Sequence, residues 1–341
     1  MGEVESRIAA TLIVGPSWVG DMVMAQSVFK ILKSREPDRA LDVLAPDWSL
    51  PVVARMPEIR NGIASETAHR RIGLATRRRI AKSLQDTGYD RALVLPRSAK
   101  AALIPWFARI RTRTGYRGES RYWFINDIRS FDPEVLDQTV KRFVALGLDE
   151  GDVLPPVLPE PALIISAENQ ARVSQDLGIS TEKPVIAMMP GAEYGPAKCW
   201  PHEHFTALAA RLDDAGYDVW VLGSFKDKPA GDVIAGGSRA VNLCGRTSLE
   251  DVIELLAACE QAVSNDSGLM HIAAAAGCHV HGIYGSSSSK YTPPLTKNHD
   301  IHETGIDCSP CFARKCPLGH MKCLTDLEPT RIFEKIVSKS T

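Results

Sequence analysis

The sequence predicts an α/β protein of two domains, each a parallel sheet flanked by helices. Its 341 residues exceed what one compact core usually holds and fit two domains of ordinary size. Short β-branched runs alternate with helical patterns on both sides of a proline-rich segment, as in parallel sheets with crossover helices. An apolar fraction of 44% and a charged fraction of 24% are typical of a globular enzyme.

Seven strands are expected from these runs. Three precede the proline-rich segment, at 10–15, 40–46 and 90–96, and four follow it, at 184–191, 217–224, 261–266 and 279–285. Ligands of open parallel sheets bind beyond the carboxyl ends of the strands. The loops that follow the strands are therefore the places to look for functional residues.

The domains are expected to meet in VLPPVLPEPALIIS, residues 153–166, whose four prolines can continue neither helix nor sheet. We assign residues 1–155 to an N-terminal domain and 156–325 to a C-terminal domain. The closing helix, within 326–341, is expected to cross back onto the first domain. Two such domains joined by a linker predict a cleft between them.

The first strand leads into IVGPSWVGDMVMAQ, residues 13–26, which matches neither common phosphate-binding motif. A dinucleotide site needs three glycines in a fixed spacing, and a P-loop needs Gly-Lys-Ser/Thr where Asp21 stands. A carboxylate at a helix start repels phosphate. Asp21 is then an ordinary N-cap, a general base that takes a proton from an attacking hydroxyl, or both.

The second half holds a stronger phosphate signal in AVSNDSGLMHIAAAAG, residues 262–277. Gly268 lets the backbone approach a ligand, Ser267 can donate a hydroxyl, and the helix start offers N–H donors to a pyrophosphate. His271 would add a donor to a departing phosphate, and its alternative is a packed core histidine. For Asp266 the alternative is another N-cap.

Two further loops are expected to complete this pocket. Lys198, in MMPGAEYGPAKCWP, is a mobile point charge suited to a phosphate, against the alternative of a solvated lysine. In VLGSFKDKPAGD, Ser224 turns the chain and Asp227 is placed to accept from ribose hydroxyls, against the alternative of a solvated helix start.

Basic residues gather in one stretch. From His69 to Arg129 there are 15 of them and only four acidic residues. We interpret the excess as a surface for an anionic partner at a membrane face, with a merely solvated surface as the alternative. Nucleic acid is disfavoured, because no helix-turn-helix, RNA-binding or zinc-finger pattern accompanies the charge. No stretch is long and apolar enough for a membrane span or signal peptide, so a cytoplasmic location is expected.

Five loops together resemble a known family. GPSWVGDMVMAQS, PGAEYGPAKCWP, GSFKD, NLCGRTSLEDVIELLAAC and SNDSGLMHIAAAAG, in this order, are similar to the ADP-heptose:lipopolysaccharide heptosyltransferases, glycosyltransferase family 9. The resemblance implies a GT-B fold of two Rossmann-like domains facing a cleft, and an inverting transfer from ADP-heptose that requires no metal or other cofactor. The acceptor it implies is heptosyl-Kdo2-lipid A at the cytoplasmic face of the inner membrane, so peripheral association is expected.

The resemblance also implies roles for individual residues. The general base falls on Asp21, and Lys198 and His271 are expected to assist the departing diphosphate. The donor is expected to contact Lys198, Ser224, Asp227, Asp266, Ser267, Gly268, Leu269 and His271. The acceptor is expected to contact Ser17, Trp18, Gly20, Arg97, Lys100, Arg117 and Arg121.

Some alternatives stay open. A different heptosyltransferase step, a non-catalytic module that binds a nucleotide-sugar or glycolipid, and an oxidoreductase lacking its usual fingerprint are the competing functions. Four of the eight cysteines cluster, with spacings compatible with tetrahedral zinc, and the alternative is a set of reduced thiols. These are Cys308, Cys311, Cys316 and Cys323.

Overall fold

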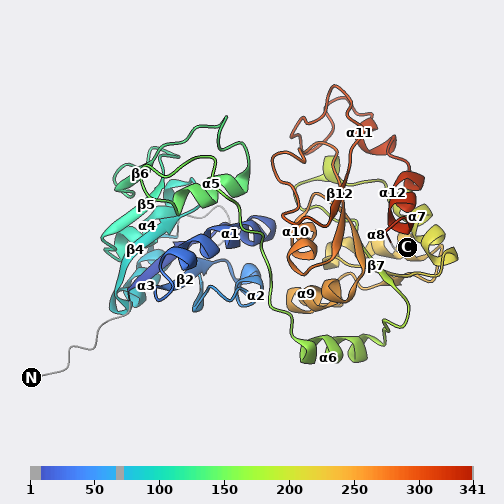
Figure 1. Ribbon diagram of the computed structural model, residues 1–341, viewed down its shortest axis with the longest axis horizontal. Coiled ribbons are helices and arrows are strands. Elements are labelled where there is room, and N and C mark those ends of the chain that lie inside the picture. The colour runs from blue at the N-terminus through green and yellow to red at the C-terminus, as the bar shows by residue number, and fades with distance from the viewer. Residues whose placement is uncertain (1–8, 67–72, 340–341) are drawn as a thin grey trace, which may run out of the picture. The chain divides into compact units, whose positions relative to one another are not determined.

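The computed structural model describes residues 9–66 and 73–339. The chain divides into two compact units, residues 1–160 and 161–341, so the division falls within the proline-rich segment and five residues beyond the expected boundary. Each unit is an α/β fold around a sheet of six strands (Figure 1). The His69 end of the basic stretch lies outside the described residues.

The first sheet has the order β3-β2-β1-β4-β5-β6, and every pairing in it is parallel. Its strands are β1 (Ala10–Val14), β2 (Ala40–Ala45), β3 (Asn61–Ala64), β4 (Tyr89–Val94), β5 (Thr112–Tyr116) and β6 (Asp127–Arg129). Its helices are α1 (Val19–Arg35), α2 (Leu50–Val53), α3 (Leu74–Leu84), α4 (Leu103–Phe107) and α5 (Thr139–Leu146). Strand β1 is buried along its whole length because helices cover both faces, which explains its continuous apolar run.

The second sheet repeats this topology, with the parallel order β12-β11-β10-β7-β8-β9. Its strands are β7 (Val185–Met189), β8 (Asp218–Val221), β9 (Val241–Asn242), β10 (Gln261–Asn265), β11 (His279–Ile283) and β12 (His299–His302). Its longer helices are α6 (Ala167–Leu177), α7 (His202–Asp214), α8 (Lys228–Ala235), α9 (Leu249–Ala258), α10 (Gly268–Ala275) and α12 (Pro329–Val337). The short α11 (Lys322–Thr325) precedes α12. The predicted α/β class with two Rossmann-like sheets is confirmed.

The closing helix α12 is part of the second unit and packs within it, and its expected contact with the first domain stays a prediction. Ile332 and Ile336 are fully buried in the same apolar cluster as Trp200 and Phe205, and the helix packs against α7. Its apolar face is therefore occupied within the second unit.

Every one of the seven expected strands is present, and the structure adds β3, β5, β6, β9 and β12.

Candidate active site

The start of α10 is arranged to receive an anion. Asp266 follows β10, Ser267 is the N-cap with φ −142° and ψ 170°, and Gly268 is the first helical residue. The side chain of Ser267 makes no cap hydrogen bond to the first turn. Helix starts leave N–H groups without intrahelical partners, and their dipoles favour negative charge. This is the loop, Asp266 to Leu269, that the sequence predicts for pyrophosphate, and Asp266 is not its N-cap.

Lys198 lies beside this helix start. It ends a single helical turn, η4 (Pro196–Lys198), and its Nζ is 2.5 Å from Oδ2 of Asp266. The Lys198 side chain is 18% exposed and that of Asp266 only 5%, so the pair is largely shielded from water. An ammonium has three donors, and one carboxylate does not saturate them. Lys198 thus balances a buried carboxylate and keeps N–H capacity for a further anion.

Asn265 fastens the Lys198 loop to the end of β10. Its Oδ1 accepts from the backbone N–H of Trp200 at 2.9 Å, and its Nδ2 donates to the carbonyl of Pro190 at 2.6 Å. Asn265 is fully buried, and each of these two bonds satisfies a group that burial would otherwise penalise. Sequence reasoning assigned Asn265 no role, although a polar residue ending an apolar strand was the available signal.

Asp227 and Ser224 form a capping box in the turn η5 (Phe225–Asp227). Oδ2 of Asp227 accepts from the backbone N–H of Ser224 at 2.8 Å and from its Oγ at 2.7 Å. Gly191 approaches the same carboxylate so closely that a Cβ there would lie 2.4 Å from Oδ1. The cap therefore uses one oxygen of Asp227, and ribose binding through this side chain stays a prediction.

His271 lies in the first turn of α10 and is 4% exposed. Burial lowers its pKa to about 4, although the nearby Asp266 acts in the opposite direction. The imidazole is neutral at pH 7, so it can offer a departing phosphate a hydrogen bond but no charge. Its Nδ1 has no hydrogen-bond partner among the described residues.

In the first unit, Asp21 is the third residue of α1. The N-cap is Trp18, which makes no side-chain cap bond, so the N-cap interpretation of Asp21 is wrong. Gly20, which precedes Asp21, is buried. Ser17 and Trp18 are exposed, and Trp18 is 50% exposed. Trp48, which sequence reasoning missed, donates from Nε1 to the carbonyl of Ser17 at 2.9 Å and is 45% exposed. Two half-exposed indoles thus belong to the loops that follow β1 and β2, and flat apolar faces of this kind suit sugar rings.

Three basic candidates lie in the loops that follow β4 and β5, and these strands come directly after β1 in the order of the sheet. Arg97, Lys100 and Arg117 are all exposed. The two loops touch through a bond from the Glu119 N–H to the Arg97 carbonyl, and a Cβ at Gly118 would overlap that carbonyl. Because β1, β4 and β5 are parallel neighbours, these charges gather at the same sheet edge as Asp21.

Arg121 does not join them, which corrects its prediction as an acceptor residue. It is 1% exposed, and its guanidinium donates to the carbonyls of Tyr116, Pro96 and Ser98. Burial lowers its pKa to about 10. Its role is to brace the loops that carry Arg97 and Arg117.

The basic stretch is only partly a surface. Arg77 is buried, Arg91 pairs with Glu36, and Arg129 pairs with Asp127. The exposed basic residues of its described part are Arg78, Arg79, Lys82, Arg97, Lys100, Arg109, Arg111 and Arg117.

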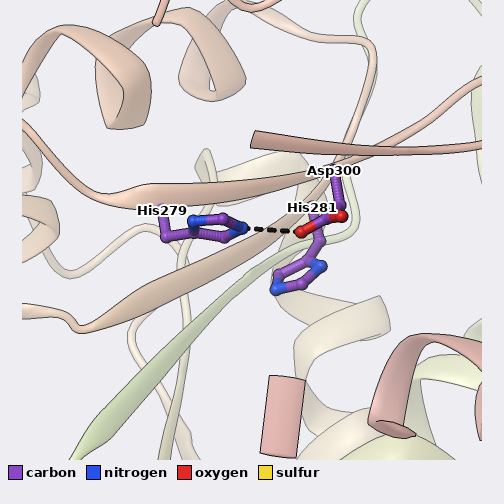
Figure 2. A group of neighbouring side chains, drawn as sticks. All are labelled: His279, His281 and Asp300. Carbon is purple, nitrogen blue, oxygen red and sulfur yellow. Dashed lines mark hydrogen bonds and ion pairs between the residues drawn. The ribbon is translucent and has the colours of Figure 1, made fainter. Parts of the chain in front are cut away.

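Figure 2 shows a different polar cluster, made by His279, His281 and Asp300 of β11 and β12. Nε2 of His279 lies 2.8 Å from Oδ2 of Asp300, and the two nitrogens of His281 contact His302 and Gln261. His279 begins β11 and Asp300 lies early in β12, so the cluster is at the amino ends of these strands. The loop that starts α10 follows the carboxyl end of β10, so the cluster lies toward the opposite end of the parallel strands.

Taken together, an uncapped helix start with a lysine–aspartate pair, on a doubly wound parallel sheet, is an arrangement suited to binding phosphorylated ligands. Residues 77–322 match the model of glycosyltransferase family 9 (heptosyltransferase). Lipopolysaccharide heptosyltransferase 2 of Salmonella typhimurium is 41% identical over 338 residues, which cover 96% of this chain and 97% of that protein. Its counterpart in Escherichia coli K12 is 40% identical over 336 residues, 95% and 97% of the two chains.

A solved structure agrees. The structure of ADP-heptose lipopolysaccharide heptosyltransferase II of E. coli superposes with a TM-score of 0.87 at 40% identity, covering 96% of this chain and 98% of that one. The chain belongs to glycosyltransferase family 9, the heptosyltransferases.

Proposed function

We propose that this glycosyltransferase moves L-glycero-D-manno-heptose from ADP-heptose to the first heptose of the lipopolysaccharide inner core. The observation that supports a diphosphate donor is the uncapped start of α10 beside the Lys198–Asp266 pair. The heptose and the acceptor are inferred from the relatives, heptosyltransferase 2 enzymes at 40–41% identity over nearly the whole chain.

In the proposed reaction the second unit holds the donor. The N–H groups of the first turn of α10, the Oγ of Ser267 and the ammonium of Lys198 bind the diphosphate. As ADP leaves, these groups stabilise the negative charge that grows on its terminal phosphate, which is where fixed donors are most effective. His271 contributes one N–H while neutral. Since this set already supplies cationic and dipolar stabilisation, we propose that transfer needs no metal or other cofactor.

The first unit holds the acceptor and supplies the base. The carboxylate of Asp21 takes the proton of the acceptor hydroxyl, and the freed oxygen attacks the anomeric carbon. The bond from that carbon to the β-phosphate oxygen breaks on the opposite face, which inverts the configuration. The charges of Arg97, Lys100 and Arg117, together with the faces of Trp18 and Trp48, are proposed to bind the phosphorylated, acidic sugars of the core.

Peripheral membrane association is part of the proposal, because the acceptor carries lipid. None of the helices in residues 9–66 and 73–339 combines the length and hydropathy of a bilayer crossing. The loop between β5 and β6 exposes Trp123 by 85% and Tyr122 by 54%, and it also carries Arg117. Aromatic rings beside cationic groups favour the interface of an anionic bilayer.

The transfer step is tested by ADP release from ADP-heptose with lipopolysaccharides truncated before, at and after the first heptose. We expect release only with the one-heptose acceptor, together with a product heavier by one heptose. Release with the heptose-free acceptor would instead assign the preceding step, and binding of ADP-heptose without release from any acceptor would indicate a non-catalytic module.

The membrane step is tested by sedimentation with anionic vesicles. A Trp123→Ser variant should bind less than wild type, and Trp106→Ser, a substitution at a 40% exposed indole outside this loop, should have the smaller effect. Equal binding by all three proteins would contradict the assignment of this loop.

A further inference from the structure

The segment between β12 and α11, residues 303–321, carries three cysteines, and a fourth, Cys323, is in α11. It contains no helix or strand, and most of its residues are exposed. A long irregular segment in a compact unit usually has a function or an internal staple. This segment has little apolar core of its own, so its order needs another source.

The four cysteines line one cavity. A cavity of about 190 Å³ is lined by Cys308, Cys311, Cys316 and Cys323, with Ser286 and His320 also at its wall. All four cysteines are free. Cys323 is buried, Cys316 is partly buried, and Cys308 and Cys311 are exposed. Thiols around one cavity are the ligand type that a soft divalent cation prefers.

The turn after Cys316 is closed by a hydrogen bond from the N–H of Gly319 to the carbonyl of Cys316, at 3.3 Å. It takes left-handed backbone at Gly319, φ 73°, and at Met321, φ 53°. For a non-glycine residue such as Met321 that conformation costs of order 1 kcal/mol. The turn keeps Cys316, which is partly buried, at the wall of the cavity.

The neighbouring histidine cluster is the competing metal site. Among the described residues, His279, His281 and Asp300 are the group of three whose ligand atoms lie within 4.8 Å of one another, so the sulfurs are spread more widely (Figure 2). However, both nitrogens of His281 are engaged by protein partners, and Lys339 lies 3.8 Å from Asp300. Cys308 and Cys311 are exposed on an irregular segment, so their side chains can turn toward Cys316 at small cost.

We propose that this segment binds one zinc ion in tetrahedral geometry through four thiolates, those of Cys308, Cys311, Cys316 and Cys323. Spacings of two, four and six intervening residues fit such a structural site. Each thiol releases its proton to solvent as its sulfur bonds the ion, and no electron is transferred. Four protein ligands leave no open position, so the ion has a structural role.

The site also supports the loop that carries Lys198. The N–H of Ala197 donates to the carbonyl of Arg314 at 3.1 Å, and the hydroxyl of Tyr194 donates to the carbonyl of Phe312 at 2.7 Å. Gly195 lies so close that a Cβ would be 2.6 Å from the Arg314 carbonyl. Ordering of the cysteine segment by zinc therefore positions the phosphate-binding lysine. This consequence, unlike metal binding itself, rests on the proposed function.

The test begins with the full-length protein purified without chelator or metal-affinity resin. Elemental analysis should find one zinc ion per chain in wild type and in Cys278→Ala, a control at a buried cysteine outside the segment. Cys316→Ser and Cys308→Ser should retain little zinc. Cobalt added to the zinc-free wild type should give thiolate charge-transfer bands and the intense visible bands of tetrahedral cobalt, and these should be lost in Cys316→Ser.

Three results would overturn the site. The wild type could contain no metal and give no thiolate bands with cobalt, or Cys316→Ser could keep the zinc content and the cobalt bands of wild type. Freshly purified protein could also contain disulfides among these four cysteines. Iron in place of zinc would overturn the choice of ion. ADP affinity, measured by calorimetry, should fall about 10-fold on zinc removal and return on zinc addition. If the cysteines bind zinc but its removal leaves ADP affinity unchanged, only the proposed coupling between the zinc site and Lys198 is wrong. The proposed function is tested separately, by the transfer assay with defined acceptors.

Discussion

The two units use the same structural element, a central strand followed by a helix, in opposite electrostatic ways. At the start of α1 the chain supplies its own carboxylate, Asp21, as the third helical residue. At the start of α10 no carboxylate stands within the helix, and Asp266 just before it is paired with Lys198. A helix start favours negative charge. In the proposed reaction the first unit therefore supplies a carboxylate as the proton acceptor, and the second supplies donors for the diphosphate.

The sharpest way to break this comparison is Asp21→Asn. The amide keeps the size of the side chain but cannot take a proton, so we expect transfer to fall ~10³-fold, within the range typical of a lost general base. ADP affinity should be unchanged, because in the proposed reaction ADP is bound by the other unit. Enzyme turnover and calorimetric titration with ADP measure the two quantities.

Wild-type turnover by Asp21→Asn would show that Asp21 is only a helix-start residue. A matched loss of ADP affinity would place the diphosphate at α1 and reverse the roles of the two units.

Lys198→Ala should have the next largest effect. It removes a cation from the diphosphate and leaves the buried carboxylate of Asp266 without its partner, so transfer should fall ~10²-fold and ADP affinity roughly as much. Lys226→Gln is the control, since Lys226 forms an exposed pair with Glu193 and is 76% exposed. We expect that control to behave as wild type in both assays.

The double variant Lys198→Ala/Asp266→Asn separates the two causes. It should recover part of the lost ADP affinity, because the unpaired carboxylate is gone. No recovery would indicate that Lys198 acts only by binding phosphate directly.

The fold could be predicted from sequence where strands are covered by helices on both faces. The expected runs at β1, β2, β4, β7, β8, β10 and β11 are apolar for that reason. The missed strands lie mostly toward the sheet edges, such as β6 and β9, where short sequences like DIR and VN carry no periodic signal. These strands could not be predicted because their place near a sheet edge is decided by the topology of the sheet.

The proximity of Lys198 and Asp266 could be predicted, because each belongs to a loop that follows one of two neighbouring strands, β7 and β10. The site could not be predicted where burial decides the role. Arg121 and Arg117 are the same residue type four positions apart, yet one is buried against carbonyls and the other is exposed. Trp48 was missed because its place beside Ser17 depends on a long-range hydrogen bond.

Acid should weaken the second unit before the first. Burial lowers the pKa of His281 to about 3, and that of His302 and His271 to about 4. A histidine whose folded pKa is depressed contributes stability above its unfolded pKa of about 6.5, and this is lost as the pH falls from there toward 4. We expect a loss of roughly 2 kcal/mol per histidine between pH 6.5 and 5, at 1.36 kcal/mol per pH unit.

The first unit should lose stability only at lower pH. Burial opposes the ionisation of Asp42, but hydrogen bonds from Arg60 and Tyr89 outweigh it and hold its pKa below the ordinary value. This contribution is lost below about pH 4. Hydrogen exchange in urea at pH 7 and pH 5 distinguishes the units, and His302→Gln should flatten the pH dependence of the second. Equal weakening of both units at pH 5 would contradict this assignment.

The smallest predicted effect concerns two capping boxes in the second unit, which are similar in form and which we propose to differ in function. Ser224 with Asp227 caps η5, and Ser248 with Asp251 caps α9, each through the same pair of bonds. Asp227→Asn and Asp251→Asn should each cost about 1 kcal/mol of unfolding free energy, measured in urea, because each weakens one cap. Only Asp227→Asn should also lower ADP affinity, by roughly 10-fold, since a ribose hydroxyl bonds better to a carboxylate than to an amide. If the two variants bind ADP equally well, Asp227 is a cap and nothing more, and the donor site ends at Lys198 and α10.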